Sequence, residues 1–350
     1  MQDLSEIVKI KEAAEADLLK RPGVTAVDVG YKYVNGKRTG EIAIRVHVKE
    51  KKDVPLDQQI PQTIGGITAD VLQNAFVPYV LKIPTTEVMP EADVGIYNPL
   101  QGGISIGPCR TVDGNEYAGT LGAIVLDKVS VTPMMLSNFH VMAIDNGSNT
   151  GDPMVQPSLI DGGKCPGDVA GTLQQKSLGG SVDCAVARIT GRSSANKIVD
   201  VGLLRGTAQA ALGMVIRKRG QRTELTYGTI DSVSMTLPID YGDGLGMVTL
   251  TNQVGLQVDS TRSTILADYG DSGSVVVNEE NKAIGLFFAG SDDKMFGSAN
   301  PIESVLEALN IISINPGSLR QFLLLMGIDP SKGLRSIRPH IVSVRSFMGI

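Results

Sequence analysis

The sequence of 350 residues is long enough for two or three domains, and its 42% of hydrophobic residues provide for a sizeable core. Forty glycines, 17 prolines and no tryptophan favour a turn-rich, mainly β protein. The formal net charge of −5 argues against nucleic-acid binding, and no apolar run approaches the roughly 20 residues that a membrane-spanning helix needs. We therefore expect neither a nucleic-acid nor a membrane partner.

Residues 1–90 predict a small α+β module. Apolar residues recur at helical spacing over residues 5–20, which predicts an amphipathic helix. Residues 24–31 and 41–48 alternate as strands, and the dipeptide Asn35-Gly36 between them is a strong hairpin signal. This part of the chain has no cluster of catalytic residue types, so we interpret it as a structural, regulatory or assembly domain.

Residues 91–312 predict a second, strand-rich domain that follows a linker at 84–90. Its predicted strands cover residues 118–127, 131–136, 169–175, 182–189, 226–230, 247–250, 275–277 and 283–290. A polar break divides this domain into halves of about residues 100–190 and 200–312. A helix with proline at its start, over residues 301–309, closes the domain.

The tail, residues 313–350, combines basic residues with an apolar helical face. Leu319, Phe322, Leu323 and Met326 share that face, which predicts a C-terminal helix packed on the body. A segment that docks a partner or inhibits the protein is the alternative interpretation. The tail and the N-terminal module are thus the two candidate surfaces for a homo-oligomer or another partner.

One glycine-rich turn, Gly270-Asp271-Ser272-Gly273-Ser274, leads directly into the apolar strand at 275–277. Glycine on both sides of the serine permits a sharp turn and a close approach of a substrate carbonyl. The amides of Gly270 and Ser272 can then donate to a developing oxyanion. Taken alone, the turn fits either a nucleophilic serine or an ordinary connection between strands.

A serine hydroxyl needs a positioned base, and the chain has three histidines. His47 lies in an alternating strand, which predicts a place on a sheet surface, and His340 lies in the basic tail. His140 stands where a strand gives way to a loop. Asp183 lies in an otherwise apolar strand, where an unpaired carboxylate is costly, so we expect it to have a partner.

The order His140, Asp183, Ser272, with GDSG around the serine, resembles the chymotrypsin-like (trypsin-fold) serine peptidases. The stretches LSNFHV, VDCAVA and GDSGS are most similar to the bacterial and plant branch that includes the plant narrow-leaf protein. The resemblance covers ordered motifs over residues 100–312. It implies two β-barrels, with His140 as general base, Asp183 as its orienter and Ser272 as nucleophile. Phe139 departs from the pattern, because the animal enzymes carry a small residue there.

Two further expectations concern residues around these motifs. Asp161 and Asp168 are rival acids, but their glycine-rich loops are typical of solvated turn aspartates. The basic stretch at 214–223 resembles a hairpin of the family's second barrel, so we expect it to be solvated.

The specificity pocket is less well defined by the sequence. The strand at 283–290 resembles the family strand that lines this pocket and pairs with extended substrate. Leu266 falls near the position that decides charge preference. With Phe288 and Gly290, it favours an apolar or small substrate side chain, although a small shift toward Asp268 would reverse that preference.

The cysteines predict a reducing environment. Cys109, Cys165 and Cys184 are odd in number and lack metal-ligand spacing. The first 19 residues lack the pattern of a signal peptide. We therefore expect a cytoplasmic protein that needs no disulfide and is equally stable with or without reductant.

These features predict a serine endopeptidase that hydrolyses protein or peptide substrates through an acyl-enzyme, with no metal or organic cofactor. A catalytically silent scaffold and an esterase or acyl-transfer enzyme are the alternatives. In the family, a newly released N-terminus pairs with the aspartate before the nucleophile, here Asp271. Because a whole domain precedes Gly103, we expect another internal donor for Asp271 and an uncut chain that is already competent, rather than cleavage near Gly102-Gly103.

Overall fold

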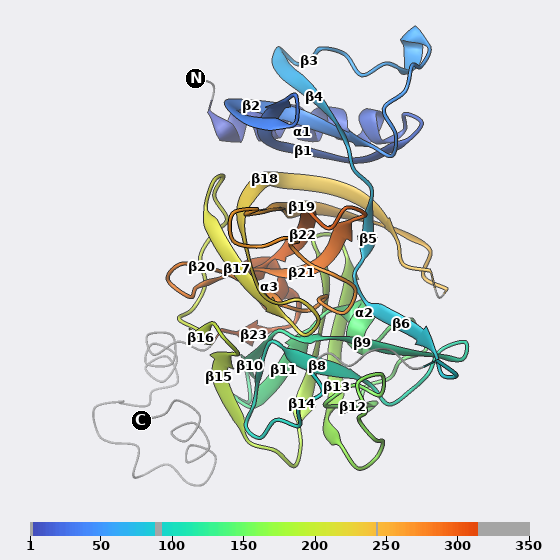
Figure 1. Cartoon of the computed structure of the whole chain (residues 1–350), viewed down its shortest axis with the longest axis vertical. Coiled ribbons are helices and arrows are strands. Elements are labelled where there is room, and N and C mark those ends of the chain that lie inside the picture. The colour runs from blue at the N-terminus through green and yellow to red at the C-terminus, as the bar shows by residue number, and fades with distance from the viewer. Residues whose placement is uncertain (1–2, 88–92, 243, 314–350) are drawn as a thin grey trace.

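The computed structural model describes residues 3–87, 93–242 and 244–313. The predicted C-terminal helical tail lies outside these residues. Two β-rich bodies and a small N-terminal module follow one another along the long axis of the molecule (Figure 1). This mainly β architecture confirms the predicted fold class. None of the helices in the described part of the chain is both long and apolar enough to cross a membrane.

The N-terminal module has the predicted helix and hairpin. Asp3 caps the helix by accepting a hydrogen bond from the backbone N–H of Ser5. Asn35 and Gly36 both have positive φ, as the two-residue hairpin turn requires. The elements are α1 (Leu4–Leu19), β1 (Val24–Val34), β2 (Lys37–Val48), a 3₁₀ turn (Leu56–Gln58), β3 (Thr63–Ile64) and β4 (Ile67–Gln73). One face of the sheet and the apolar side of α1 form a shared core.

The second body is a closed barrel whose sheet continues into the module. Its strands are ordered β17-β20-β21-β22-β19-β18, and β18 pairs with β17 again. They are β17 (Val215–Gly220), β18 (Glu224–Asp240), β19 (Met247–Val258), β20 (Val275–Asn278), β21 (Ala283–Ser291) and β22 (Phe296–Pro301). Beyond the ring, β18 also pairs antiparallel with β1 of the module. The module is therefore joined to this barrel by strand pairing as well as by the chain.

The first body is formed by the preceding part of the chain. Its order is β10-β11-β14-β13-β12-β8-β9, with β23 beside β10 and β6 (Leu81–Pro84) beside β9, and only Gly122 separates β9 from β10 along the chain. The strands are β8 (Ile104–Pro108), β9 (Asn115–Leu121), β10 (Ala123–Asp127), β11 (Pro133–Ser137), β12 (Pro153–Val155), β13 (Val169–Gly179) and β14 (Val182–Ile189). Short pieces complete the fold: β7 (Leu100–Gly102), β15 (Ser194–Ile198), β16 (Gly202–Leu203), α2 (Phe139–Met142), α3 (Ile302–Ala308) and β23 (Ile311–Ile312).

A buried ionic cluster joins the module to the second barrel. Arg45 of β2 donates to both carboxylate oxygens of Asp28, at 2.6 and 2.7 Å, and to Asp231 of β18 at 2.5 Å. Burial alone would raise the pKa of Asp28, but the charge of Arg45 and the neighbouring His47 hold it well below its usual range. The pairing of β1 with β18 is thus reinforced by charges that have little access to water.

His47 belongs to this cluster, so the prediction that it lies on a sheet surface was wrong. Its Nε2 is 3.0 Å from Asp28, and the residue is 1% exposed. The alternating pattern showed which residues share a face of β2. It did not show that the barrel covers that face.

The segment after β4 leaves the module and lies on both barrels. β5 (Phe76–Pro78) pairs antiparallel with β21, and Figure 1 shows it running down beside that strand. β6 (Leu81–Pro84) then pairs with β9 of the first barrel. The connection between the module and the body is therefore a strand-like segment bound along its length.

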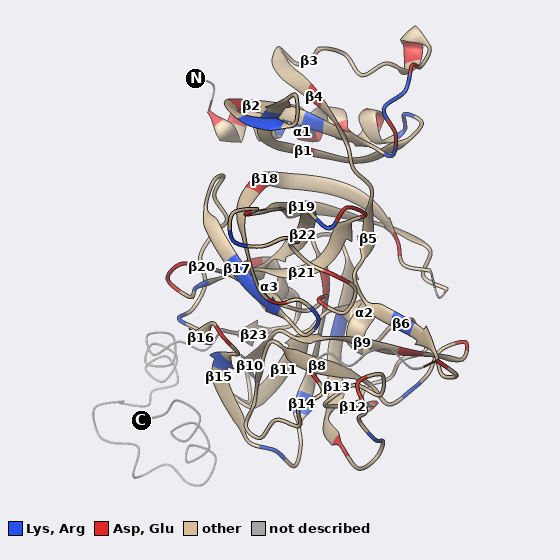
Figure 2. Cartoon of the chain, in the orientation of Figure 1, with Lys and Arg blue, Asp and Glu red and all other residues tan. Residues whose placement is uncertain are grey.

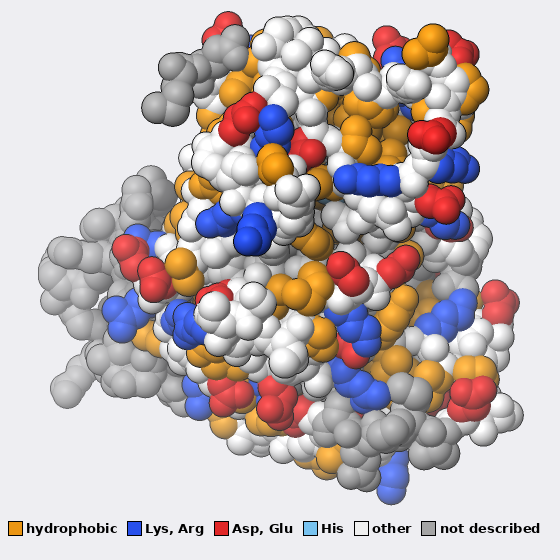
Figure 3. All heavy atoms as spheres, turned by 45° about the horizontal axis from the view of Figure 1, so that its top comes forward, with side chains coloured by type: hydrophobic (Ala, Val, Ile, Leu, Met, Phe, Trp, Pro, Cys, Tyr) orange, Lys and Arg blue, Asp and Glu red, His pale blue; other side chains and the backbone are white. Residues whose placement is uncertain are grey.

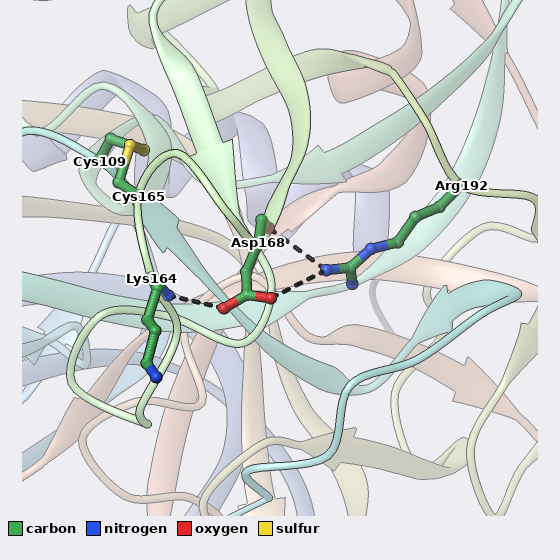
Figure 4. The surroundings of a disulfide bond; sticks show 5 residues. All are labelled: Cys109, Lys164, Cys165, Asp168 and Arg192. Atoms are coloured by element: carbon green, nitrogen blue, oxygen red, sulfur yellow. Dashed lines mark hydrogen bonds and ion pairs between the residues drawn. A yellow bond between two sulfur atoms is a disulfide. The ribbon is translucent and has the colours of Figure 1, made fainter.

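Cys109 and Cys165 form a disulfide, which corrects the expectation that none is needed (Figure 4). The odd count of cysteines hid the pair, because the third, Cys184, is buried and unpaired in β14. Beside the disulfide, Asp168 accepts a hydrogen bond from the backbone N–H of Lys164, and Arg192 contacts Asp168. The predicted cytoplasmic location stays a prediction.

We expect reductant to destabilise the protein. The disulfide closes a loop between residues 56 positions apart, and the loop-entropy relation assigns such a crosslink about 4 kcal/mol. Urea unfolding with and without dithiothreitol should show a lower midpoint under reductant. A Cys109→Ser/Cys165→Ser variant should be insensitive to the reductant. Equal midpoints for the native chain would contradict this expectation.

Charged side chains of both signs are scattered over the fold. Figure 2 shows basic residues on β17, and on the face in Figure 3 acidic and basic side chains are interspersed. The predicted absence of nucleic-acid and membrane partners stays a prediction.

Candidate active site

The structure brings His140 and Asp183 into direct contact. His140 lies in α2, just after β11, and Asp183 lies in β14, which pairs with β11. His140 Nδ1 hydrogen-bonds Asp183 Oδ2, and the His140 backbone N–H donates to Asp183 Oδ1 at 3.2 Å. The residues are 4% and 0% exposed. The carboxylate therefore fixes the orientation of the ring, and Nε2 has no hydrogen-bond partner among the described residues.

Three more side chains hold Asp183, and the sequence did not identify them. Tyr241 donates its hydroxyl to Asp183 Oδ2 at 2.8 Å, Asn138 donates to the Asp183 carbonyl at 2.6 Å, and Asn300 accepts from its backbone N–H at 3.1 Å. Burial, and then the Asp183 charge, raise the pKa of Tyr241, so the tyrosine remains a donor. Tyr241 directly follows β18, outside the motifs that the sequence analysis singled out.

Ser272 lies in the tight turn before β20, at the junction of the two barrels. Gly270 and Gly273 have φ of 105° and 94°, which other residues rarely adopt. Thr120 of the first barrel donates its N–H to the Ser272 carbonyl at 2.7 Å and its hydroxyl to the Gly270 carbonyl at 3.0 Å. Ser272 is fully buried, and its Oγ donates to the Phe288 carbonyl at 2.9 Å. In this conformation the Ser272 hydroxyl is hydrogen-bonded to β21 rather than to His140.

The amides predicted to form an oxyanion hole converge on one oxygen. The Tyr79 carbonyl accepts from the N–H of Gly270 at 2.6 Å and from the N–H of Ser272 at 3.4 Å. The Tyr79 N–H donates to the Phe288 carbonyl at 3.1 Å. A peptide carbonyl of the chain itself therefore lies where the predicted site would receive a substrate carbonyl.

The Tyr79 side chain occupies the predicted specificity pocket. It is 1% exposed, its ring centre lies 4.9 Å from that of Tyr269 and 6.0 Å from that of Phe287, and its hydroxyl donates to the Ser291 carbonyl. Leu266 lies in the same buried cluster. Gly290 makes room for the ring, since a Cβ there would be 2.3 Å from Tyr79.

The remaining predicted pocket residue, Phe288, and the nearby Asp268 have different surroundings. Phe288 supplies its backbone carbonyl to the site, while its side chain packs in a separate cluster that contains Phe76. Asp268, which would have reversed the charge preference, forms an ion pair with Lys294 at 2.7 Å. The expectation that the uncut chain is ready for substrate was therefore wrong for this conformation, because residues 76–80 already occupy the site.

Asp271 has the internal donor that was expected. Lys218 of β17 contacts its carboxylate at 2.7 Å, and both side chains are fully buried. Burial lowers the pKa of Lys218, although Asp271 opposes that shift. The backbone N–H groups of Arg222 and Thr223 also donate to Asp271, at 3.0 and 3.1 Å. These contacts fix the turn that carries Ser272.

The same strand corrects the expectation of a solvated basic hairpin. Lys218 and Arg219 are 0% and 4% exposed, and Arg219 contacts Asp93 at 2.8 Å. Lys218 and Arg219 thus face acidic partners inside the protein, and the sequence of a single strand does not reveal those partners.

We expect Lys218→Met to destabilise the fold and reduce activity, because it leaves the Asp271 carboxylate buried without its cation. Breaking a buried ion pair from one side costs about 3–5 kcal/mol. Chemical denaturation should detect this loss. The double variant Lys218→Met/Asp271→Asn should recover most of it, and a neutral effect of Lys218→Met would contradict the assigned role.

The rival acids lie in other contacts. Asp161 is 5% exposed and accepts from the hydroxyls of Ser105 at 2.6 Å and Ser158 at 2.8 Å, so the expectation of a solvated aspartate was wrong for it. Asp168 contacts Lys164 and Arg192, as described above. Within the described residues, the carboxylate that binds His140 Nδ1 is that of Asp183.

Comparison with known proteins identifies serine proteases as structural neighbours. The chain is similar to protease A of Thermobifida fusca, at 18% identity over 62% of this chain and 99% of that one, with a TM-score of 0.45. It is similar to the chymotrypsin of Cellulomonas bogoriensis, at 18% identity, 62% and 99% coverage and a TM-score of 0.43. A glutamic-acid-specific serine protease gives 21% identity, 61% and 100% coverage and a TM-score of 0.46.

No protein-family model and no curated protein sequence matches the chain. The similarity to the narrow-leaf branch stays a prediction. Because the structural similarities are of low identity and low TM-score, the proposals below rest on the geometry of this chain.

Proposed function

We propose that the protein is a serine endopeptidase. Ser272 attacks a peptide carbonyl, His140 accepts its proton, and Asp183 orients the imidazole. The amides of Gly270 and Ser272 hold the oxyanion of the tetrahedral intermediate. His140 then protonates the leaving amine, and water hydrolyses the acyl-enzyme.

One observation carries this proposal: a peptide carbonyl, that of Tyr79, accepts hydrogen bonds from both amides of the Ser272 turn. The contact between His140 and Asp183 adds the orientation that a general base needs. In the proposed reaction Ser272 Oγ leaves the Phe288 carbonyl, by rotation about the Cα–Cβ bond, and donates to His140 instead.

The proposed substrates are proteins or peptides bound in extended form. β21 offers its edge for main-chain pairing, and the pocket that holds Tyr79 accepts a large aromatic side chain. The carbonyl of Ser291 is placed to accept the hydroxyl of a tyrosine. The proposed steps use side chains of this chain and water.

A fluorophosphonate probe tests the proposal, because it reacts covalently with an activated serine. We expect mass spectrometry to locate the adduct on Ser272 in a chain whose pocket has been emptied by Tyr79→Gly. An adduct elsewhere, or no adduct, would argue for a binding scaffold. Turnover of a peptide and of the matching ester then separates a peptidase from an esterase.

A further inference from the structure

We propose that the bond between Tyr79 and Val80 is an intramolecular substrate of Ser272, so that the protein cuts itself into residues 1–79 and 80–350. This inference rests on the proposed peptidase function and names its first substrate. It follows from the position of the segment that connects the module to the body.

On the N-terminal side of the Tyr79–Val80 bond, the backbone is bound as that of an extended substrate would be. Val77 and Pro78 of β5 lie opposite Gly290 and Ala289 of β21. The Tyr79 N–H then bonds the Phe288 carbonyl, and the Tyr79 carbonyl accepts from the turn that contains Ser272. The register of the pairing therefore places one carbonyl, and its bond to Val80, at the nucleophile.

Strand pairing also holds the segment after the bond. Leu81 and Lys82 of β6 lie opposite Ala118 and Tyr117 of β9. β9 continues through Gly122 into the β10–β11 hairpin, which precedes His140 in the chain. The segment that begins at Val80, which is the leaving group, is therefore fixed to the barrel that carries the general base. Positioning on both sides of a bond is a major source of rate acceleration, because it removes the entropy cost of bringing the groups together.

The Tyr79 side chain adds selectivity for this bond. Among the residues from 76 to 80, Tyr79 is the most buried, at 1% exposed, and its hydroxyl has an acceptor at the far end of the pocket. A polar group that is hydrogen-bonded inside a pocket fixes the depth and the orientation of the side chain that carries it. A connecting segment with a structural role alone would not need a tyrosine inserted beside Leu266 and Gly290.

The chemistry of the cleavage balances with water as the co-reactant. Ser272 Oγ bonds to the Tyr79 carbonyl carbon and gives its proton to His140 Nε2. The carbon–nitrogen bond breaks, and His140 passes the proton to the amine of Val80. Water then hydrolyses the Tyr79 ester, which leaves a Tyr79 carboxylate and restores Ser272. A hollow of about 410 Å³ beside Val80, Arg222 and Tyr269 lies next to this bond and offers water a route.

The two fragments should remain associated after cleavage. β1 stays paired with β18, and the Arg45 cluster with Asp28 and Asp231 is formed across that junction. Lys11 of α1 also donates to Thr236 of β18 at 3.0 Å. The cut should therefore free the segment from residue 76 to 79 to leave the cleft without releasing the module.

The test is to incubate the purified full chain and follow it by intact mass and N-terminal sequencing. We expect a fragment that begins at Val80, formed at a rate that does not depend on protein concentration, and co-elution of both fragments on size exclusion. Ser272→Ala should give no detectable fragment. Val80→Pro should also stay intact, because the proline ring adds bulk at the scissile nitrogen, where His140 must deliver its proton, while the extended backbone before it is retained.

The outcomes separate the self-cleavage from the peptidase function. If the native chain stays intact while Tyr79→Gly reacts with the fluorophosphonate at Ser272, the self-cleavage is wrong and the peptidase proposal stands. A cutting rate proportional to concentration would overturn the intramolecular step alone. If the native chain stays intact and Tyr79→Gly takes no probe, both proposals fail.

Discussion

Replacing Ser272 or His140 by alanine is expected to lower peptide hydrolysis by roughly six orders of magnitude, measured in the Tyr79→Gly background so that the tyrosine side chain no longer fills the pocket. Without Ser272 there is no acyl-enzyme, and without His140 the hydroxyl keeps its proton. The double variant should be about as inactive as either single variant, because the two residues act as a unit. Thermal unfolding should change little, since each substitution shortens a side chain and leaves the Asp183 contacts to Tyr241 in place.

The measurement is the initial rate of release from a quenched peptide. A His140→Ala variant with near-normal turnover would contradict the assignment of the base. An additive loss in the double variant would show that the two side chains act in separate steps.

Asp183→Asn is expected to lower turnover by roughly four orders of magnitude. The amide oxygen can take the place of Oδ1 and accept from the His140 backbone N–H, which leaves the NH₂ in the place of Oδ2. An NH₂ there faces His140 Nδ1 and favours the tautomer whose Nε2 carries the proton and cannot act as a base. Substrate binding should be largely unchanged, so the loss should fall on kcat.

Asp161→Asn and Asp168→Asn are the matched controls, since both are carboxylates of the same barrel with other partners. They should keep most of the activity of the parent chain. A larger loss at either position than at Asp183 would show that the orienting acid is misassigned.

Local features of the sequence predicted much of the fold. The helical spacing, the Asn35-Gly36 hairpin and the closing helix after Pro301 all depend on neighbours in the chain, and the structure has them. The acid inside an apolar strand predicted only that Asp183 has a partner, and the resemblance of the ordered motifs to the serine peptidases identified that partner as His140.

What the sequence did not reveal depends on partners far along the chain. Lys218 and His47 are polar residues in alternating strands, and only the acids that lie opposite them explain their burial. Tyr241 reaches Asp183 across a sequence separation of 58 residues. Residues 76–80 form a short apolar run with a proline, and its place in the cleft follows from pairing with β21, more than 200 positions later.

The most direct test of the account is hydrolysis of a synthetic peptide with the sequence of residues 74–84, which carries the Tyr79–Val80 bond. The Tyr79→Gly chain should cut it once, after tyrosine, and the same chain with Ser272→Ala should leave it intact. Product masses identify the bond. An intact peptide after prolonged incubation with correctly folded Tyr79→Gly protein, or equal cutting by the Ser272→Ala chain, would contradict the proposal that Ser272 is the nucleophile of a peptidase.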